Sequence, residues 1–471
     1  MSELLTETPA VQPPGTPAQV GPQIAVECRC TDYGNALRLA YHFRNRVFYH
    51  PDTKSWFIWN GKHWKMDNNN QITSMAVEAI RMIRTVELPL LRSSEKEYKT
   101  LYSWMGWSLN KSKLNCMVSL AQMLLPPLTP LDTNKYLLNV QNGTIDLKTG
   151  VHLPHNRNHY ITRLAPVGYD SYAECPKWLA YIHRAFKGDE VVISYFQKML
   201  GYVLTGDTTE KCFFIFWGPD GNNGKTMAIN VVRGLLGSDY CVQIASESLM
   251  SKKSPHIRSD IARLRGYRFA SASETDKQYT FNEALVKVMT GGDAITARKL
   301  YQNEIEFTPE FKLFIATNPK PAFDVTDKAM MDRVVIIPFL VPIPRQEMNK
   351  NLTRELIEEE GAGILTWAVK GAVAWSAEGL GFLPECDDVR FAPIVPVDMN
   401  DFISKCCVTG NGLQVTSCEL FTRYLEYHLD TTPVQAPLAE TAFYAEITSK
   451  GFPSVHSRYG NCRSGIALKP E

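Results

Sequence analysis

The residues that most directly indicate chemistry lie in segment 216–226, FWGPDGNNGKT. Glycines let the backbone turn its N–H groups toward phosphate oxygens, and a helix that follows adds partial positive charge. A lysine after the last glycine reaches the terminal phosphates of a nucleotide, and a threonine hydroxyl beside it ligates Mg²⁺. The predicted cofactors are therefore ATP and Mg²⁺. The predicted nucleotide-binding residues are Gly218, Gly221, Asn222, Asn223, Gly224, Lys225 and Thr226.

This segment departs from the strict phosphate-loop pattern GxxxxGK[ST], because Pro219 occupies the position of the first glycine. Either the loop carries one extra residue beginning at Gly218, or Gly221 supplies the sharp bend. We favour the second interpretation, which leaves Asp220 outside the site because an acid is poorly placed among phosphates.

The elements around the loop support its assignment to a nucleotide. CFFIFW at 212–217 is a continuous apolar run, typical of a strand buried on both faces. TMAINVVRGLLG at 226–237 has apolar residues at helical spacing and stops at Gly237. A strand, a glycine loop and a helix in succession are the context that a phosphate loop requires, whereas the alternative is a structural glycine turn.

Two further strand-like segments end in polar residues. RGYRFASASETD delivers Glu274 and Asp276, and FKLFIATNPKP ends at Asn318. If these strands share one parallel sheet with 212–217, their carboxyl ends line a common crevice. The two acids would then hold a metal and Asn318 would contact the γ-phosphate. Two solvated acids and an ordinary turn asparagine are the alternatives.

Composition sets the broader limits. A chain of 471 residues suggests about three domains. Hydrophobic residues make up 44% and charged residues 21%, as in globular proteins. The 11 cysteines include no CxxC pair, which argues against a zinc finger, and we expect reduced thiols. With a net charge of +1, any binding to DNA must come from local basic patches. Because neither an 18-residue apolar run nor a signal peptide is present, we expect a soluble cytoplasmic protein without membrane contact.

The order of four segments resembles the motor of the superfamily 3 DNA helicases, specifically the helicase part of phage and plasmid primase-helicases. These segments are GPDGNNGKT, FASASETD, LVKVMTGGDAITARKLYQNEIEFTPEFKLFIATNPKP and DRVVIIPF. The flanking TDYGNALRLAYHF, the tryptophan-rich hairpin after it, LLNVQNGTIDLKTG and YFQKMLGYVLTG resemble the N-terminal domain that precedes this motor. The resemblance covers roughly residues 30 to 470.

The resemblance implies roles for individual residues. Lys225 and Thr226 match the Walker A motif, Glu274 with Asp276 matches Walker B, and Asn318 matches the sensor of motif C. Arg333 matches an arginine finger supplied across a subunit boundary, although Asp332 stands where many relatives have a first arginine. The implied catalytic residues are Lys225, Glu274, Asn318 and Arg333, the implied metal ligands are Thr226, Glu274 and Asp276, and the implied assembly is a homo-oligomeric ring, a hexamer.

Two regions are candidates for contact with DNA. ITARKL and IEFTP flank YQNE and predict a hairpin that the resemblance places in a central pore, with lysine and arginine on phosphates and tyrosine stacked on a base. Pairing of the arginine with a local acid is the alternative. The C-terminal segment predicts helix, helix and hairpin, the outline of a winged helix, a module that binds DNA or protein. The candidate DNA-binding residues are Lys287, Arg298, Lys299, Tyr301, Arg458, Arg463 and Lys469.

The predicted fold class is α/β, a P-loop NTPase (AAA+-like) motor with a parallel sheet, preceded by an α+β domain and followed by a small winged helix. We expect a β-hairpin at 56–67 around an Asn-Gly turn, short strands in 136–155, and two or three helices in 352–380. A capping box of Thr416 and Glu419 predicts a helix start. The expected parts are a disordered tail at 1–29, an N-terminal helicase-associated domain at 30–195, the motor at 196–345, a helical subdomain at 346–395 and the winged helix at 396–471.

Together these features predict an ATP-dependent, ring-forming replicative DNA helicase of a phage or plasmid-type element, in the bacterial host cytoplasm. Expected partners are single-stranded and forked DNA, further copies of the chain, and a separate primase or other replication proteins. We expect no primase activity, because no Asp-x-Asp pair occurs before the motor. The alternatives are an origin-binding initiator ATPase whose winged helix binds duplex DNA, and a P-loop kinase, which the hairpin and Asn318 argue against.

Overall fold

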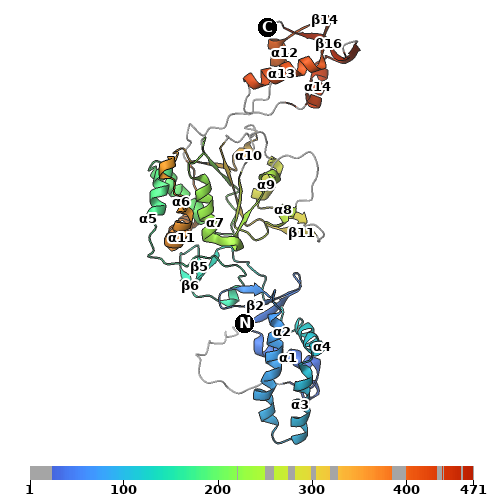
Figure 1. Cartoon of the computed structure of the whole chain (residues 1–471), viewed down its shortest axis with the longest axis vertical. Coiled ribbons are helices and arrows are strands. Elements are labelled where there is room, and N and C mark those ends of the chain that lie inside the picture. The colour runs from blue at the N-terminus through green and yellow to red at the C-terminus, as the bar shows by residue number, and fades with distance from the viewer. Residues whose placement is uncertain are drawn as a thin grey trace, which may run out of the picture. The chain divides into compact units, whose positions relative to one another are not determined.

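The computed structural model describes residues 24–219, 221–249, 259–273, 282–298, 304–318, 327–383, 399–431, 438, 440–457 and 460–469. By its internal contacts the chain divides into two compact units (Figure 1). One unit comprises Met1–Thr133 and His155–Arg163, and the other comprises Asn134–Pro154 and Leu164–Glu471. The domain boundaries expected from the sequence stay predictions. Of the expected tail at 1–29, residues 1–23 lie outside the described part, and a 3-10 helix η1 forms at Val26–Cys28.

The first unit combines four helices with a small antiparallel sheet. The helices are α1 (Asp32–Phe43), α2 (Gln71–Met82), α3 (Glu95–Ser108) and α4 (Lys111–Ala121). A π-helix, η2 (Ile83–Glu87), and a 3-10 helix, η3 (Leu88–Leu91), follow α2, and a 3-10 turn, η4, forms at Arg157–His159. The sheet has the order β1 (Val47–His50), β2 (Ser55–Trp59), β3 (Trp64–Met66). The predicted hairpin is confirmed: Trp59 pairs with Trp64 around the turn, in which Gly61 has φ 94°.

The second unit begins with the predicted short strands. β4 (Leu137–Val140), β5 (Gly143–Asp146) and β6 (His152–Leu153) form an antiparallel sheet. Two helices follow, α5 (Pro176–Ala185) and α6 (Glu190–Leu204). Asp189 caps α6, because its carboxylate accepts hydrogen bonds from the backbone N–H groups of Val191 and Val192.

A five-stranded parallel sheet forms the centre of this unit, in the order β13-β7-β12-β9-β8. Its strands are β7 (Phe213–Trp217), β8 (Cys241–Gln243), β9 (Phe269–Ser273), β12 (Lys312–Thr317) and β13 (Val334–Pro338). Both faces of β7 are covered. Phe214 and Phe216 belong to one apolar core with α5, α6 and α7, and Phe213, Ile215 and Trp217 belong to a second core with α9. The predicted α/β fold with a parallel sheet is confirmed, and the two-sided burial explains the unbroken apolar run.

Shorter elements connect these strands. α7 (Lys225–Tyr240) follows the glycine loop, and its helical geometry breaks at Gly237, which has φ 69° and ψ −179°. A 3-10 turn η5 (Ser246–Ser248), helix α8 (Ser259–Ala262) and helix α9 (Glu283–Gly291) come next. The predicted hairpin is confirmed as β10 (Ile295–Arg298) paired antiparallel with β11 (Glu304–Phe307), whereas its bend at 299–303 lies outside the described residues. α10 (Lys328–Met331) precedes β13, and η6 (Arg345–Glu347) follows it.

The region expected to form two or three helices is a single helix, α11 (Leu352–Glu378), so that prediction is wrong. The glycines that suggested breaks serve close packing against neighbouring elements. A Cβ on Gly371 would lie 2.1 Å from the carbonyl oxygen of Gln197, and a Cβ on Gly201 of α6 would lie 2.0 Å from the backbone nitrogen of Ala372. Glycine thus permits α6 and α11 to touch backbone to backbone.

The C-terminal residues form a small subdomain with its own apolar core. Its helices are α12 (Met399–Cys406), α13 (Ser417–Thr431) and α14 (Glu440–Ser449). Its strands are β14 (Cys407–Thr416), β15 (Ser454–Ser457) and β16 (Gly460–Leu468), in the order β14-β16-β15. Three helices with a terminal hairpin match the predicted winged helix. The predicted capping box is confirmed, because the Thr416 hydroxyl accepts from the Glu419 N–H at 3.2 Å.

Within the described residues, we find no helix of the length and hydrophobicity that crossing a membrane requires.

Candidate nucleotide-binding site and DNA interface

The glycine loop lies between β7 and α7, at the edge of the sheet where parallel strands end together. The Gly218 N–H donates to the Thr317 carbonyl of β12 at 3.4 Å, and the Trp217 indole N–H donates to the Asn318 carbonyl at 3.1 Å. These bonds bring Asn318, which is exposed, beside the start of the loop. β9 reaches the same edge, because Ser273 is in register with Ala316 of β12. Glu274 and Asp276 follow β9 in the chain and lie outside the described residues, as does Asp220.

The bend of the loop falls on two residues other than Gly221. Asn222 has φ 62° and Gly224 has φ 90°, whereas the φ of Gly221 is not positive. The interpretation that Gly221 supplies the sharp bend is therefore corrected. Left-handed backbone at 222 and 224 turns the chain directly into the first turn of α7, and asparagine is among the few residues besides glycine that tolerate it.

Lys225 is buried at the start of α7, with 6% of its surface exposed. Its ammonium donates to the Asn223 side-chain oxygen at 2.6 Å and to the Gly218 carbonyl at 3.2 Å. Asn223 is also buried, and its amide donates to the Phe339 carbonyl at 2.8 Å. The Lys225 ammonium is thus held inside the loop beside oxygens of Asn223 and Gly218, whose places phosphate oxygens can take. Thr226 in the first turn is exposed.

Two groups that the sequence analysis did not identify, the Tyr181 hydroxyl and the Phe339 carbonyl, contact the loop. The hydroxyl of Tyr181 on α5 donates to the Gly224 carbonyl at 3.1 Å, and burial raises the pKa of this tyrosine. A Cβ on Gly224 would lie 2.8 Å from the Tyr181 hydroxyl, and a Cβ on Gly218 would lie 2.3 Å from the Phe339 carbonyl. Two of the loop's glycines are therefore required by contacts of the protein with itself. The only sequence signal for Tyr181 was its place on the apolar face of an amphipathic segment.

The described part of the loop suits the phosphates of a nucleoside triphosphate, since it offers a buried ammonium and backbone N–H groups at a helix start. For Mg²⁺, it offers the exposed Thr226 hydroxyl. Among the described residues, no group of three or more His, Cys, Asp and Glu side chains is arranged to hold a metal ion.

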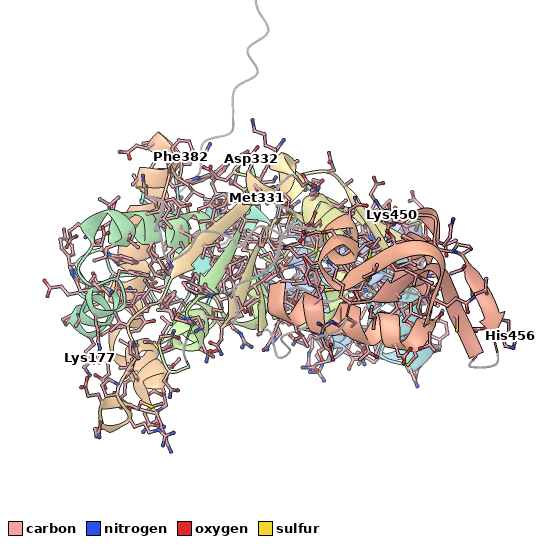
Figure 2. The ribbon with its side chains drawn as sticks, turned by 90° about the horizontal axis from the view of Figure 1, so that it is seen from above. Lys177, Met331, Asp332, Phe382, Lys450 and His456 are labelled. Carbon is pink, nitrogen blue, oxygen red and sulfur yellow. The ribbon has the colours of Figure 1, made fainter. Side chains whose placement is uncertain are left out.

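Arg333 lies between α10 and β13. Its guanidinium donates to the Ala329 carbonyl at 2.5 Å, and its Nε atom is buried with no hydrogen-bond partner among the described residues. Asp332, labelled in Figure 2, is exposed beside it. The role of Arg333 as a finger in a neighbouring subunit stays a prediction.

The candidate DNA-binding residues of the motor are placed differently from one another. Arg298 is exposed at the end of β10, and Lys299 and Tyr301 lie outside the described residues. Lys287 on α9 forms an ion pair with Asp327, the N-terminal cap of α10, and this hydrogen bond lowers the pKa of the Asp327 carboxyl. The structure thus shows Lys287 linking two helices, and its contact with DNA stays a prediction.

In the winged helix, one predicted phosphate contact is corrected. Arg463 is only 6% exposed, its guanidinium donates to the Thr448 hydroxyl at 2.7 Å, and it lies 4.8 Å from the centre of the Tyr444 ring. The Arg463 guanidinium therefore contacts Thr448 and Tyr444 within the subdomain and does not face solvent. Lys469 is exposed and donates to the Ser404 carbonyl at 2.6 Å, and Arg458 lies outside the described residues. Lys450, directly after α14, and His456, on β15, are labelled in Figure 2.

Comparison with known proteins gives independent information. Residues 36–187 match the family described as "D5 N terminal like". The chain is 29% identical over 232 residues to "Putative helicase L207/L206" of Acanthamoeba polyphaga mimivirus, which covers 48% of this chain and 24% of that protein. It is 28% identical over 219 residues to "Putative helicase 121R" of Invertebrate iridescent virus 3, covering 44% of this chain and 23% of that protein.

A further relative is "Putative primase C962R" of African swine fever virus (isolate Tick/Malawi/Lil 20-1/1983), 25% identical over 210 residues, which cover 43% of this chain and 22% of that protein. The matched region thus spans less than a quarter of the length of these curated relatives. Among solved structures, the apo C-terminal region (305–718) of NrS-1 aligns over 92% of this chain and 99% of that chain, with a TM-score of 0.46 and 10% identity.

Proposed function

The chain belongs to the phage and viral primase-helicase family, and from this premise we propose that it is an ATP-dependent helicase that acts on DNA in replication. The observation that carries the proposal is the buried ammonium of Lys225, held at the start of α7 by Asn223 and Gly218. Buried lysines are uncommon, and this one lies at the end of a glycine loop, at the start of a helix.

The chemistry proposed for the loop is hydrolysis of the terminal phosphate bond of ATP. The Lys225 ammonium and the N–H groups of the loop would stabilise the charge that grows on the phosphate oxygens. Bound Mg²⁺ would neutralise phosphate charge, with Thr226 and Glu274 or Asp276 as its protein ligands. Asn318 would hold the γ-phosphate, and Glu274 would orient the attacking water.

The proposal extends to assembly and to movement of DNA. Arg333 of one subunit would complete the ATP site of the next subunit. Such head-to-tail contact favours a closed ring, which the resemblance to superfamily 3 helicases implies is a hexamer. The hairpin of β10 and β11 would then carry single-stranded DNA through the ring, with Arg298 and Lys299 on phosphates and Tyr301 on a base. Substitution of Arg333 tests the first step, and substitution of Arg298, Lys299 and Tyr301 tests the second.

The test is ATP hydrolysis by the full chain with and without single-stranded DNA. In Lys225→Ala we expect the rate to fall by roughly 10²-fold or more, because the positive charge at the phosphates is lost. Lys65→Ala is the matched control, because Lys65 is exposed on β3 in the other unit. A Lys225→Ala protein that hydrolyses ATP as fast as wild type would refute the proposal.

A second candidate function is origin binding, which the winged helix with its exposed Lys469 favours. In that case, ATP would control assembly alone, and duplex DNA would bind through the C-terminal subdomain. ATP hydrolysis would then not respond to single-stranded DNA, and Lys469→Ala would reduce the salt dependence of duplex binding by about one phosphate contact.

A further inference from the structure

Helix α3 in the first unit carries more exposed aromatic and apolar surface than a helix facing solvent requires. Tyr98, Tyr102, Trp107 and Leu109 are 37%, 51%, 52% and 40% exposed. Residues 98, 102 and 109 are separated by four and seven positions, so they share one face of the helix. The rings of Tyr98 and Tyr102 are parallel, with an interplanar angle of 6° and centroids 6.4 Å apart.

The charges around these rings are unbalanced. Segment 92–113 holds five basic and two acidic residues, a net charge of +3. Both acids are already paired, Glu95 with Lys99 at 2.7 Å and Glu97 with Arg29 at 2.9 Å. The exposed cations left without an ion-pair partner in the described part of the chain are Arg92, Lys96 and Lys111. The surface therefore suits a partner with negative charge and flat apolar groups.

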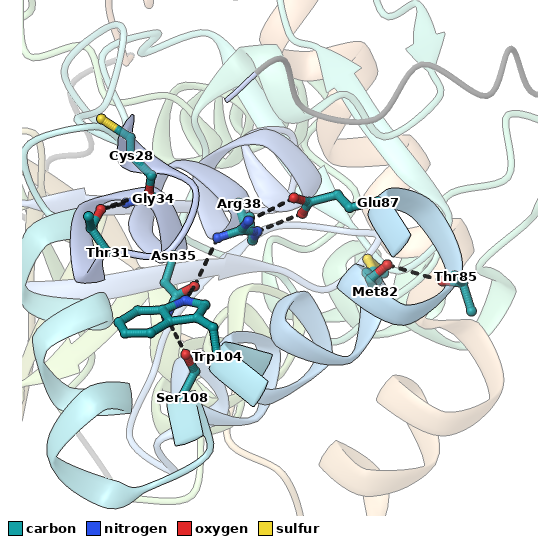
Figure 3. Close-up of polar contacts among 10 residues, drawn as sticks. All are labelled: Cys28, Thr31, Gly34, Asn35, Arg38, Met82, Thr85, Glu87, Trp104 and Ser108. Carbon is teal, nitrogen blue, oxygen red and sulfur yellow. Dashed lines mark hydrogen bonds and ion pairs between the residues drawn. The ribbon is translucent and has the colours of Figure 1, made fainter. Parts of the chain in front are cut away.

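A buried network of hydrogen bonds between α1 and α3 fixes the orientation of α3 (Figure 3). The Asn35 side chain of α1 donates to the Ser108 hydroxyl at 2.9 Å and accepts from the Trp104 indole at 3.1 Å. Asn35 is itself held by Arg38, which donates to its side-chain oxygen at 3.0 Å. The network bonds to two residues of α3 that are one turn apart, so the helix is held in one position. Because the exposed rings are then already ordered, the entropic cost of binding a partner is lower.

We propose that the exposed surface of α3 and its flanking residues, from Arg92 to Lys111, binds single-stranded DNA, with Tyr98 and Tyr102 stacking on bases and the free cations on phosphates. Trp107 lies on another side of the helix, where the Lys113 ammonium is 4.1 Å from the centre of its ring. Stacking on aromatic side chains beside a basic surface is the physical basis of single-strand binding. A second copy of this face fits less well, because two surfaces with the same excess of positive charge repel each other. The choice of DNA rests on the proposed function, whereas the stacking and the charge do not.

The experiment is binding of a fluorescein-labelled 20-mer of dT to the full chain without nucleotide. Removing two stacked rings in Tyr98→Ala/Tyr102→Ala should weaken binding by roughly tenfold or more. Tyr172→Ala is the matched control, because Tyr172 is 91% exposed in the other unit. Arg92→Ala/Lys96→Ala/Lys111→Ala should reduce the slope of log affinity against log salt by about 2.

Two further arms make the outcome decisive. A 20-mer of abasic residues should bind more weakly than dT, and 5-iodouracil photo-crosslinking should label the tryptic peptide 100–111, which contains Tyr102. Unchanged affinity in the tyrosine variant, equal affinity for the abasic 20-mer, or crosslinks only outside α3 would each overturn the proposal. Because no ATP is used, such a failure would leave Lys225-dependent hydrolysis intact, and a failure of hydrolysis would leave this binding intact.

Discussion

The Arg38–Glu87 pair in the first unit allows a worked prediction. Arg38 is 0% exposed and Glu87 is 8% exposed. The guanidinium donates to both carboxylate oxygens, at 2.6 and 2.7 Å (Figure 3). Glu87→Gln keeps the shape of the side chain and removes its charge, which leaves a buried guanidinium without compensation. Breaking a buried pair in this way costs about 3–5 kcal/mol of the free energy of unfolding.

Hydrogen–deuterium exchange of the full chain measures this cost locally. At 1.36 kcal/mol per factor of ten, the slowest amides of α1 and α2 should exchange roughly 10²-fold to more than 10³-fold faster in Glu87→Gln. Glu78→Gln is the matched control, because Glu78 is exposed on α2. Arg38→Met/Glu87→Leu should restore protection, because an apolar pair needs no charge compensation. If α1 exchanges at the wild-type rate in Glu87→Gln, the pair does not stabilise the unit and the reasoning is wrong.

Three further predictions concern packing, the loop and pH. Gly371→Ala should lower the melting temperature, because the new Cβ meets a backbone carbonyl of α6 at 2.1 Å, whereas Gly106→Ala on α3, with nothing within 4 Å, should raise it or leave it unchanged. Tyr181→Phe should raise the KM for ATP by roughly fivefold through loss of about 1 kcal/mol from the bond to the loop, and an unchanged KM would contradict this. Burial lowers the pKa values of His42 and His159 below 6.5. As the pH falls, these two histidines therefore bind protons in the unfolded chain before they do so in the folded chain. The first unit should therefore be fully stable above about pH 6.5 and lose stability as the pH falls through that value, and urea midpoints should show a smaller loss in His42→Gln/His159→Asn.

The sequence was sufficient for features that depend on local pattern. The unbroken apolar run of β7 predicted a strand covered on both faces, and two cores cover it. Asn60-Gly61 predicted a hairpin turn, and Thr416 with Glu419 predicted a helix start; both follow from backbone preferences that neighbours a few residues away decide.

The features that escaped the sequence depend on contacts between distant segments. Glycines within 352–378 suggested breaks, but α6 approaches α11 so closely that only glycine fits at Gly371. Tyr181 is 43 residues before Gly224 and meets it only in the folded chain. Arg463 has the residue type of a phosphate contact, yet the fold turns it against Tyr444. Composition and spacing report none of these pairings, because each is a tertiary contact.

Unwinding of a forked DNA duplex by the full chain, followed by release of a fluorescent strand, tests the proposed function most directly. Wild type should displace the strand with ATP and Mg²⁺ and not without ATP, Lys65→Ala should match wild type, and Lys225→Ala should displace none. If wild type hydrolyses ATP and displaces no strand, the protein is not a helicase. If Lys225→Ala displaces the strand as well as wild type does, unwinding is not driven by this site.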